Sequence, residues 1–325
     1  MLTDNFNRVI NYLRVSITDR CDLRCRYCTD SGFSFTPHPE ILRYEEIIRF
    51  VRIAASLGVK KIRLTGGEPL RRKDLSFLLK QIDAIGSIDD ISLTTNGVEL
   101  ADAVETLRDA GLRRVNISLD SLRPERFAYI TRVDAFDKVI RSIDAAKRAG
   151  LHPVKINTVI IKGFNDDEVL DFAEFARNRG VQVRFIEFMP FGDGGLWDRS
   201  RIVGSAYLEE QIRRVHDLHP SLNSEKGPAK MFHLNGSTGQ VGFISPMSTH
   251  ICHECNRIRL TPDGKIKPCL FSDTEYDVKA LFRQGALDNE VADFVRSAVM
   301  AKPERKVETT GAIRKCQRSM RNIGG

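Results

Sequence analysis

The feature that most constrains this fold is the regular alternation of short β-like runs and amphipathic helical stretches between Tyr12 and Met189. Strands are predicted at residues 12–17, 61–65, 90–94, 114–119, 153–160 and 182–188. Helices are predicted between them, for example at residues 43–57 and at residues 134–149, where Gly150 ends the apolar period. Such β/α units favour a parallel sheet with the helices packed outside it.

The two faces of the predicted strands differ in polarity. Side chains two residues apart lie on the same face of a strand. The first five strands each carry one polar pair on a face: Arg14 and Ser16, Arg63 and Thr65, Ser92 and Thr94, Asn116 and Ser118, and Lys155 and Asn157. Their other face is aliphatic, as in Val15 and Ile17. A doubly wound sheet is apolar on both faces, so this α/β pattern predicts an incomplete (β/α)6 TIM-like barrel with a polar interior.

The pattern changes after Met189. A Gly-rich stretch is followed by a predicted helix at residues 206–216, a polar linker, several short strands and a helical stretch at residues 277–301. We therefore expect a partial barrel over residues 1–190. A smaller α+β segment over residues 191–325 is expected to close the open side of that barrel.

Most of the cysteines fall into two triplets. The first triplet directly follows the first predicted strand and consists of Cys21, Cys25 and Cys28. Loops after barrel strands carry the active sites of such folds. The second triplet, in the C-terminal segment, consists of Cys252, Cys255 and Cys269. Zinc sites and iron–sulfur clusters normally use four ligands, so each triplet predicts either a distant fourth ligand or a position kept for another group.

Composition and charge narrow the class of protein. The chain is 42% hydrophobic and 29% charged, and it has neither a long apolar run nor the apolar core of a signal peptide. We therefore expect a cytoplasmic protein without a membrane partner, in which the thiols stay reduced. The net charge of +7 is concentrated from Ala301 to Gly325, where seven Lys or Arg stand against two Glu. A solvated basic tail explains this charge better than a nucleic-acid site does.

Three short motifs follow the next three predicted strands: "TGGEP", "TTNG" and "SLDS". Each alone is an ordinary turn, but together with the first cysteine loop they surround one mouth of the barrel. The CxxxCxxC spacing, Tyr27 before the last cysteine and the GGEP motif resemble the radical S-adenosylmethionine enzymes. That resemblance implies a 4Fe-4S cluster on the first triplet, with S-adenosylmethionine at the remaining iron and reductive cleavage to a 5'-deoxyadenosyl radical.

The second triplet, the "NRIRL" segment after it and the terminal Gly-Gly resemble one family within that superfamily, the GTP 3',8-cyclases (molybdenum cofactor biosynthesis protein A). The resemblance implies a second 4Fe-4S cluster on the second triplet, whose free iron meets guanine. It assigns GTP contacts to Arg14, Arg63, Thr94, Lys155, Arg257 and Arg259. It assigns S-adenosylmethionine contacts to Tyr27, Gly67, Ser118, Met189 and Arg184. Catalytic roles fall on Arg257, Arg259, Gly324 and Gly325.

The resemblance also implies the reaction and the partners. A lyase of this family converts GTP to 3',8-cyclo-7,8-dihydro-GTP, the first step of molybdenum cofactor (molybdopterin) biosynthesis. It implies an electron donor protein, a homodimer and a downstream cyclic pyranopterin monophosphate synthase.

Two alternatives stay open. One is a radical enzyme of another substrate with an auxiliary cluster, to which Cys316 or His253 could add the fourth ligand. The other is a zinc-stabilised nucleic-acid-binding protein, suggested by a pI of about 9.1. Such a protein has no use for the GGEP motif or for a polar barrel interior.

Overall fold

A computed structural model of the chain describes residues 1–28, 34–191, 196–221, 227–249, 252–306, 316 and 318–324. Its centre is a curved parallel sheet whose strands follow the predicted positions. These strands are β1 (Tyr12–Ser16), β2 (Lys61–Thr65), β3 (Asp90–Thr95), β4 (Arg114–Ser118), β5 (Val154–Ile160) and β6 (Gln182–Glu187). Each pairs in parallel with the next, in sequence order. The prediction of a partial TIM-like barrel is therefore confirmed.

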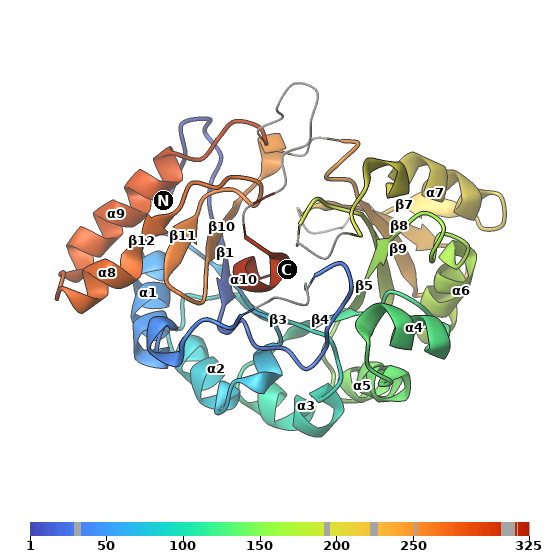
Figure 1. The fold of residues 1–325 in the computed structure, drawn as a ribbon, viewed down its shortest axis with the longest axis horizontal. Coiled ribbons are helices and arrows are strands. Elements are labelled where there is room, and N and C mark those ends of the chain that lie inside the picture. Colours follow the sequence, from blue (N-terminus) through green and yellow to red (C-terminus); the bar gives the residue numbers. More distant parts are fainter. Residues whose placement is uncertain are drawn as a thin grey trace.

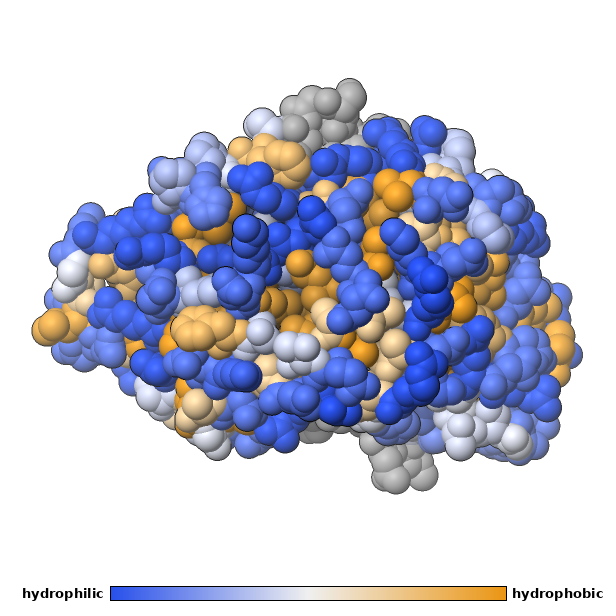
Figure 2. Space-filling model, turned by 90° about the horizontal axis from the view of Figure 1, so that it is seen from below, coloured by the Kyte–Doolittle hydropathy of each residue, from blue (hydrophilic) through white to orange (hydrophobic). Residues whose placement is uncertain are grey.

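Helices cover the outside of this sheet (Figure 1). They are α1 (Tyr44–Ser56), α2 (Leu75–Asp83), α3 (Leu100–Asp109), α4 (Pro124–Thr131), α5 (Phe136–Arg148) and α6 (Val169–Arg179). The aliphatic strand face packs against them: Val15, Ile62 and Ile91 are fully buried in one hydrophobic core. On the face that Figure 2 shows, hydrophilic residues predominate, with hydrophobic residues between them. Burial of the apolar stripes therefore holds the helices on the sheet.

The C-terminal segment extends the sheet at both edges. Strand β9 (Gln240–Ile244) pairs in parallel with β6, and β10 (Arg257–Leu260) pairs in parallel with β1. Antiparallel strands continue beyond them, namely β7 (Leu218–Pro220), β8 (Ala229–Leu234), β11 (Lys265–Lys267) and β12 (Tyr276–Asp277). Since one sheet runs through both parts, the division at residue 190 stays a prediction.

The predicted helical stretch at residues 277–301 is wrong in one respect, because it consists of two helices. Helix α8 (Val278–Arg283) and helix α9 (Asp288–Met300) are separated at Gly285, whose φ is +81°. Backbone at this φ leaves the right-handed helix and favours glycine. Helix α7 (Ser205–Arg213) matches the start of the other helix predicted in this segment and ends earlier. None of the helices in the described ranges is long and apolar enough to cross a bilayer.

The C-terminal end of the chain enters the barrel. Helix α10 (Met320–Ile323) lies inside the ring of strands and carries the C-terminus with it (Figure 1). Arg321 and Ile323 are buried there. The solvated tail predicted from the basic composition of residues 301–325 is therefore wrong for α10, which lies in the interior.

Candidate active site

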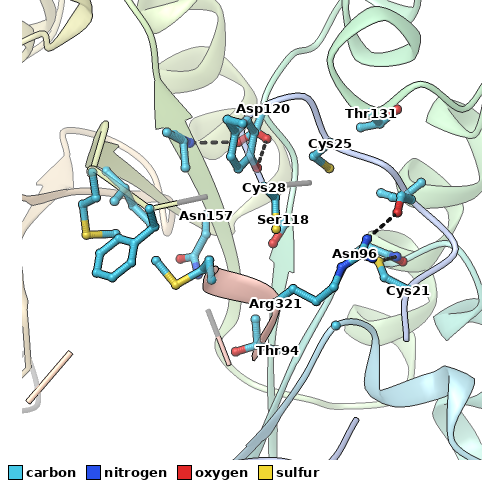
Figure 3. A pocket seen from close by; sticks show the side chains of 18 of the residues that line it. Cys21, Cys25, Cys28, Thr94, Asn96, Ser118, Asp120, Thr131, Asn157 and Arg321 are labelled. Atoms are coloured by element: carbon cyan, nitrogen blue, oxygen red, sulfur yellow. Dashed lines mark hydrogen bonds between the residues drawn. The ribbon is translucent and has the colours of Figure 1, made fainter. Parts of the chain in front are cut away.

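The first cysteine triplet lines a cavity of about 210 Å³ at the carboxyl ends of the parallel strands. The motifs after the next strands line the same cavity, through Gly66, Gly67, Asn96, Ser118 and Asp120. Figure 3 shows the three cysteines around this pocket together with Ser118, Asp120 and Asn157. The prediction that these motifs surround one mouth is therefore confirmed.

The loops after β1 and β2 are fastened to each other by backbone contacts. The amide of Gly67 donates to the carbonyl of Thr18 at 2.6 Å, and the amide of Glu68 donates to that of Arg20 at 2.7 Å. A Cβ atom on Gly67 would lie 2.7 Å from the Asp19 carbonyl oxygen, closer than a real Cβ contact. Glycine is required here because the cysteine loop passes directly over this backbone.

A buried carboxyl group connects the TGGEP motif to the TTNG motif. Glu68 accepts hydrogen bonds from the Thr95 hydroxyl at 2.8 Å and from the Asn96 amide at 2.6 Å. The side chain of Asn96 in turn donates to Asp22 at 2.6 Å, within the cysteine loop. Since Glu68 is 1% exposed, these donors replace the water it has lost. The GGEP glutamate therefore positions the loop that carries the first triplet.

The last motif holds the aromatic residue of the cysteine loop. The hydroxyl of Tyr27 donates to Asp120 at 2.6 Å, and the amide of Val159 donates to the other carboxylate oxygen at 2.9 Å. Burial raises the pKa of Asp120 to about 6, which the two donors oppose. Asp120 thus connects the ends of β4 and β5 to the residue before Cys28.

The environment of the first triplet disfavours free thiolates. Burial raises the pKa of Cys21 to about 12, and burial also raises the pKa of Cys25 well above its usual value. An iron cluster would remove these protons, because a coordinated thiol is deprotonated. Within the described ranges, no group of three or more His, Cys, Asp or Glu converges on one metal ion. A cubane does not need such convergence, because each thiolate binds a different iron atom.

The second cysteine triplet lines a separate cavity of about 200 Å³. Among the described residues that line it are several basic ones and no acidic ones; the basic residues are Arg14, Arg63, Arg184, Arg257, Arg259, Lys302 and Lys306. Strand register explains part of this concentration, because Arg14 of β1 lies opposite Arg63 of β2 on one side and Arg259 of β10 on the other. Neighbouring strands thus present their guanidinium groups to the same space.

Burial and the neighbouring positive charges shift the pKa values of several groups in this cavity. Burial, followed by repulsion from Arg259 and Arg63, lowers the pKa of Arg14 well below its usual value. Burial also lowers the pKa of Arg259 to about 10, with Arg257 as the next cause. Burial alone would raise the pKa of Cys255, but Arg257 and Lys302 lower it to about 6. The concentration of positive charge favours an anion in this cavity and favours the thiolate form of Cys255.

The C-terminal tail borders both cavities. Met320 lines both of them, and Arg321 lines the first, where it projects from α10 toward the cysteines (Figure 3). The carbonyl of Gly324 accepts a hydrogen bond from Arg259 at 3.2 Å. Gly324 has a φ of +82°, and a Cβ atom on it would overlap the Thr65 hydroxyl. The tail therefore fits only with glycine at this position.

We expect Gly324→Ala to displace the tail. The substitution meets both an unfavourable φ and a steric overlap, at a cost of about 1–3 kcal/mol. Protease cleavage near the C-terminus should become faster, and the thermal unfolding temperature should fall. Adding Thr65→Ala removes the overlap and leaves the φ strain. The double variant should therefore lose less stability than the sum of the losses in the two single variants. Strict additivity would contradict the described contact.

An ion-pair cluster fastens the tail before it enters the barrel. Arg318 donates to both carboxylate oxygens of Asp263, at 2.9 and 2.8 Å, and contacts Glu275 at 2.6 Å. Lys267, which is 1% exposed, completes the cluster at 3.2 Å from Glu275. Bidentate pairs of this kind are the strong ones, so the cluster anchors the tail to the turn between β10 and β11.

Removing this anchor should free the tail without unfolding the barrel. We expect Arg318→Ala to raise amide hydrogen exchange in residues 318–324 about tenfold or more, since partly buried charged hydrogen bonds contribute about 1.5–3 kcal/mol. Arg296→Ala is the matched control, because it breaks only the exposed pair with Asp293 on α9. Equal exchange in the two variants would show that Arg318 is not the anchor.

Most residues assigned by the family resemblance line one of the two cavities. Three of them do not line the cavity proposed for the ligand assigned to them. Thr94, assigned to GTP, lines the first cavity, and Arg184, assigned to S-adenosylmethionine, lines the second. Lys155 is 5% exposed and lines neither. Gly325 lies outside the described residues. Their roles stay predictions.

Several cavity residues were missed by sequence reasoning. Lys302 is 4% exposed, and its ammonium donates to the carbonyls of Arg257 at 2.9 Å and Pro268 at 2.6 Å. Lys306 and Met320 also line the second cavity. No periodic pattern marks these positions, because they come from the tail. Asn157 is different, because the strand pattern places it on the polar face with Lys155 but assigns it no ligand.

Comparison with known proteins gives a consistent result. The Radical SAM superfamily model matches residues 15–176, and the Molybdenum Cofactor Synthesis C model matches residues 181–308. GTP 3',8-cyclase of Thermodesulfovibrio yellowstonii is 48% identical over 327 positions, covering 100% of both chains. GTP 3',8-cyclase of Syntrophomonas wolfei is 47% identical over 326 positions, again covering 100% of both.

A solved structure supports the fold. The crystal structure of Streptococcus suis SuiB bound to S-adenosylmethionine has a TM-score of 0.61 at 16% identity, covering 87% of this chain and 68% of that chain. At this identity the likeness concerns the fold alone. Together with the relatives that match along the whole length, the comparisons show that this chain belongs to the GTP 3',8-cyclase family of radical S-adenosylmethionine enzymes.

Proposed function

We propose that this chain is a lyase that converts GTP to 3',8-cyclo-7,8-dihydro-GTP in the first step of molybdenum cofactor biosynthesis. The observation that carries the proposal is the pair of cysteine-lined cavities that meet at one junction inside the barrel, one of them surrounded by arginines. Relatives that match the whole chain carry the name of this activity. A zinc-stabilised nucleic-acid-binding protein would use neither the junction nor the enclosed arginines.

The first cavity fits the cofactors that family membership implies, a 4Fe-4S cluster and S-adenosylmethionine. Three thiols on one loop border it, and thiolates are the usual ligands of such a cluster. Cysteines 21, 25 and 28 would hold the cluster. Contacts to S-adenosylmethionine are proposed for Tyr27, Gly67, Ser118, Met189 and Arg184. Together these cofactors supply a carbon radical that removes a hydrogen atom from the substrate.

The second cavity fits an anionic nucleotide. Its arginines repel one another, and a triphosphate would offset that repulsion through charge-assisted hydrogen bonds. We assign GTP to Arg14, Arg63, Thr94, Lys155, Arg257 and Arg259. A second 4Fe-4S cluster on Cys252, Cys255 and Cys269 is proposed to hold the guanine.

The protein's own contribution is positioning. Ring formation joins the 3' carbon of the sugar to carbon 8 of the base, so both must be held close together. The arginines would hold the phosphates. The catalytic residues would lie next to the C-terminal tail and are Arg257, Arg259, Gly324 and Gly325. The hydrogen bond from Arg259 to the Gly324 carbonyl supports this grouping.

The family and the composition also support proposals for the partners and the location of this protein. An electron donor protein would reduce the clusters, and the product would pass to a cyclic pyranopterin monophosphate synthase. A homodimer and a cytoplasmic location are proposed from the family and from the composition.

Anaerobic cluster reconstitution followed by turnover tests the proposal. We expect about eight irons per chain, as two cubanes require. Cyclised product should form from GTP, S-adenosylmethionine and a reductant, and ATP should not replace GTP. Zinc in place of iron, or 5'-deoxyadenosine formation that is indifferent to GTP, would contradict the proposal.

A further inference from the structure

Among the described residues that line both cavities, one has a polar side chain. Four residues line both cavities, namely Asn157, Ile186, Met189 and Met320. The other three are apolar, so within the described residues Asn157 is the one side chain of this set that can form strong hydrogen bonds at the meeting point.

The side chain of Asn157 is placed for a ligand. Its strand neighbours in β5 register are Ser118 of β4 and Arg184 of β6, which line the first and second cavity respectively. Figure 3 shows its amide pointing into the cavity, toward α10. The amide oxygen Oδ1 is buried and has no hydrogen-bond partner in the described part of the chain. A buried oxygen without a hydrogen bond destabilises the protein, and a bound donor would remove that cost.

A neighbouring asparagine shows that this placement is specific. Asn116 also faces the barrel interior with an unsatisfied Oδ1, but its amide nitrogen donates to the Leu93 carbonyl at 3.2 Å. Asn116 borders neither cavity. It is therefore a structural residue and a suitable control for Asn157.

We infer that Asn157 recognises the ribose of GTP, with Oδ1 accepting a hydrogen bond from a sugar hydroxyl. The inference rests on the proposed function. With the phosphates at the arginines and the base at the second triplet, the sugar is the part of GTP that must reach the junction to meet the first cavity. A deoxy sugar would leave Oδ1 unsatisfied beside apolar Met189, Met320 and Ile186. Asn157 is thus a positioning residue that selects ribonucleotides over deoxyribonucleotides.

Equilibrium binding to the cluster-loaded, unreduced protein without S-adenosylmethionine tests this inference. Calorimetry compares GTP, 2'-deoxy-GTP and 3'-deoxy-GTP on the wild type, Asn157→Ala and Asn116→Ala. We expect the wild type and Asn116→Ala to bind GTP about tenfold more tightly than at least one deoxy analogue, as one hydrogen bond provides. Asn157→Ala should bind GTP and the two deoxy analogues with equal affinity. A separate titration should show that this variant retains its affinity for S-adenosylmethionine. If Asn157→Ala does not fold, Asn157→Ser gives the same test, because the shorter serine side chain does not reach the sugar hydroxyl.

The outcomes separate the inference from the proposed function. Unchanged discrimination in Asn157→Ala or Asn157→Ser overturns the inference alone, as does a loss of S-adenosylmethionine affinity in place of GTP affinity. A cluster-loaded wild type that binds no GTP overturns the proposed function, and the ribose assignment falls with it.

Discussion

Replacing Cys252 with alanine should abolish the cyclised product while leaving S-adenosylmethionine cleavage possible. The second triplet would lose a ligand, and the iron content should fall from about eight to about four per chain. The loop should survive, because the Cys252 backbone carbonyl still accepts the hydrogen bond from Arg8, at 2.8 Å. 5'-Deoxyadenosine should form without product, since the radical would be generated beside a substrate that is no longer held. Iron analysis and chromatography of the products measure both effects.

Cys316→Ala is the matched control for this prediction. Cys316 lies in an apolar cluster with Phe191 and Ile323, and its sulfur is 4.0 Å from the Leu270 carbonyl oxygen. We expect this variant to retain its iron, because the thiol packs as a small hydrophobic group. A loss of iron in Cys316→Ala would support a four-cysteine auxiliary cluster instead. Loss of the first cluster in Cys252→Ala would contradict the division of roles between the triplets.

Replacing Arg14 with methionine should have opposite effects on stability and on binding. The buried guanidinium lies among Arg63, Arg257 and Arg259 in the second cavity. Removing one of these charges relieves repulsion, so the ligand-free protein should gain about 1 kcal/mol of unfolding free energy. The affinity for GTP should fall about 10- to 100-fold, because a charged hydrogen bond to phosphate contributes about 1.5–3 kcal/mol. Denaturant unfolding and calorimetry measure the two quantities.

The control for this prediction is Arg52→Met. Arg52 is exposed on α1, outside both cavities, and its replacement should change neither quantity appreciably. If Arg14→Met were destabilised and bound GTP normally, Arg14 would be a structural residue and the anion-binding role of this cavity would be wrong.

Local patterns predict much of the barrel and its polar interior. The period of two along each strand places Arg14, Arg63, Ser118 and Asn157 on the polar strand faces, and all four line a cavity. The prediction succeeds because parallel strands in register bring equivalent positions together. The cysteine spacing and the GGEP motif are likewise local, so they identify the first cavity correctly.

Features that depend on distant contacts were not predictable in this way. The pairing of β10 with β1 joins residues about 245 positions apart, and nothing in the segment "RIRL" specifies its partner. Helix α10 has only four residues, too few for a periodic signal, so its position inside the barrel could not be predicted from the sequence pattern. The assignments of Thr94, Arg184 and Lys155 depend on side-chain geometry around a bound nucleotide, and no pattern in the sequence determines that.

The most direct test of the central claim is an isotope transfer experiment with GTP deuterated at the 3' carbon. The reconstituted protein is incubated with this substrate, S-adenosylmethionine and a reductant, and the recovered 5'-deoxyadenosine is analysed by mass spectrometry. If the two cavities hold S-adenosylmethionine and GTP at their junction, the 5'-deoxyadenosine should contain one deuterium atom. Unlabelled 5'-deoxyadenosine, formed at the same rate with and without GTP, would contradict the account.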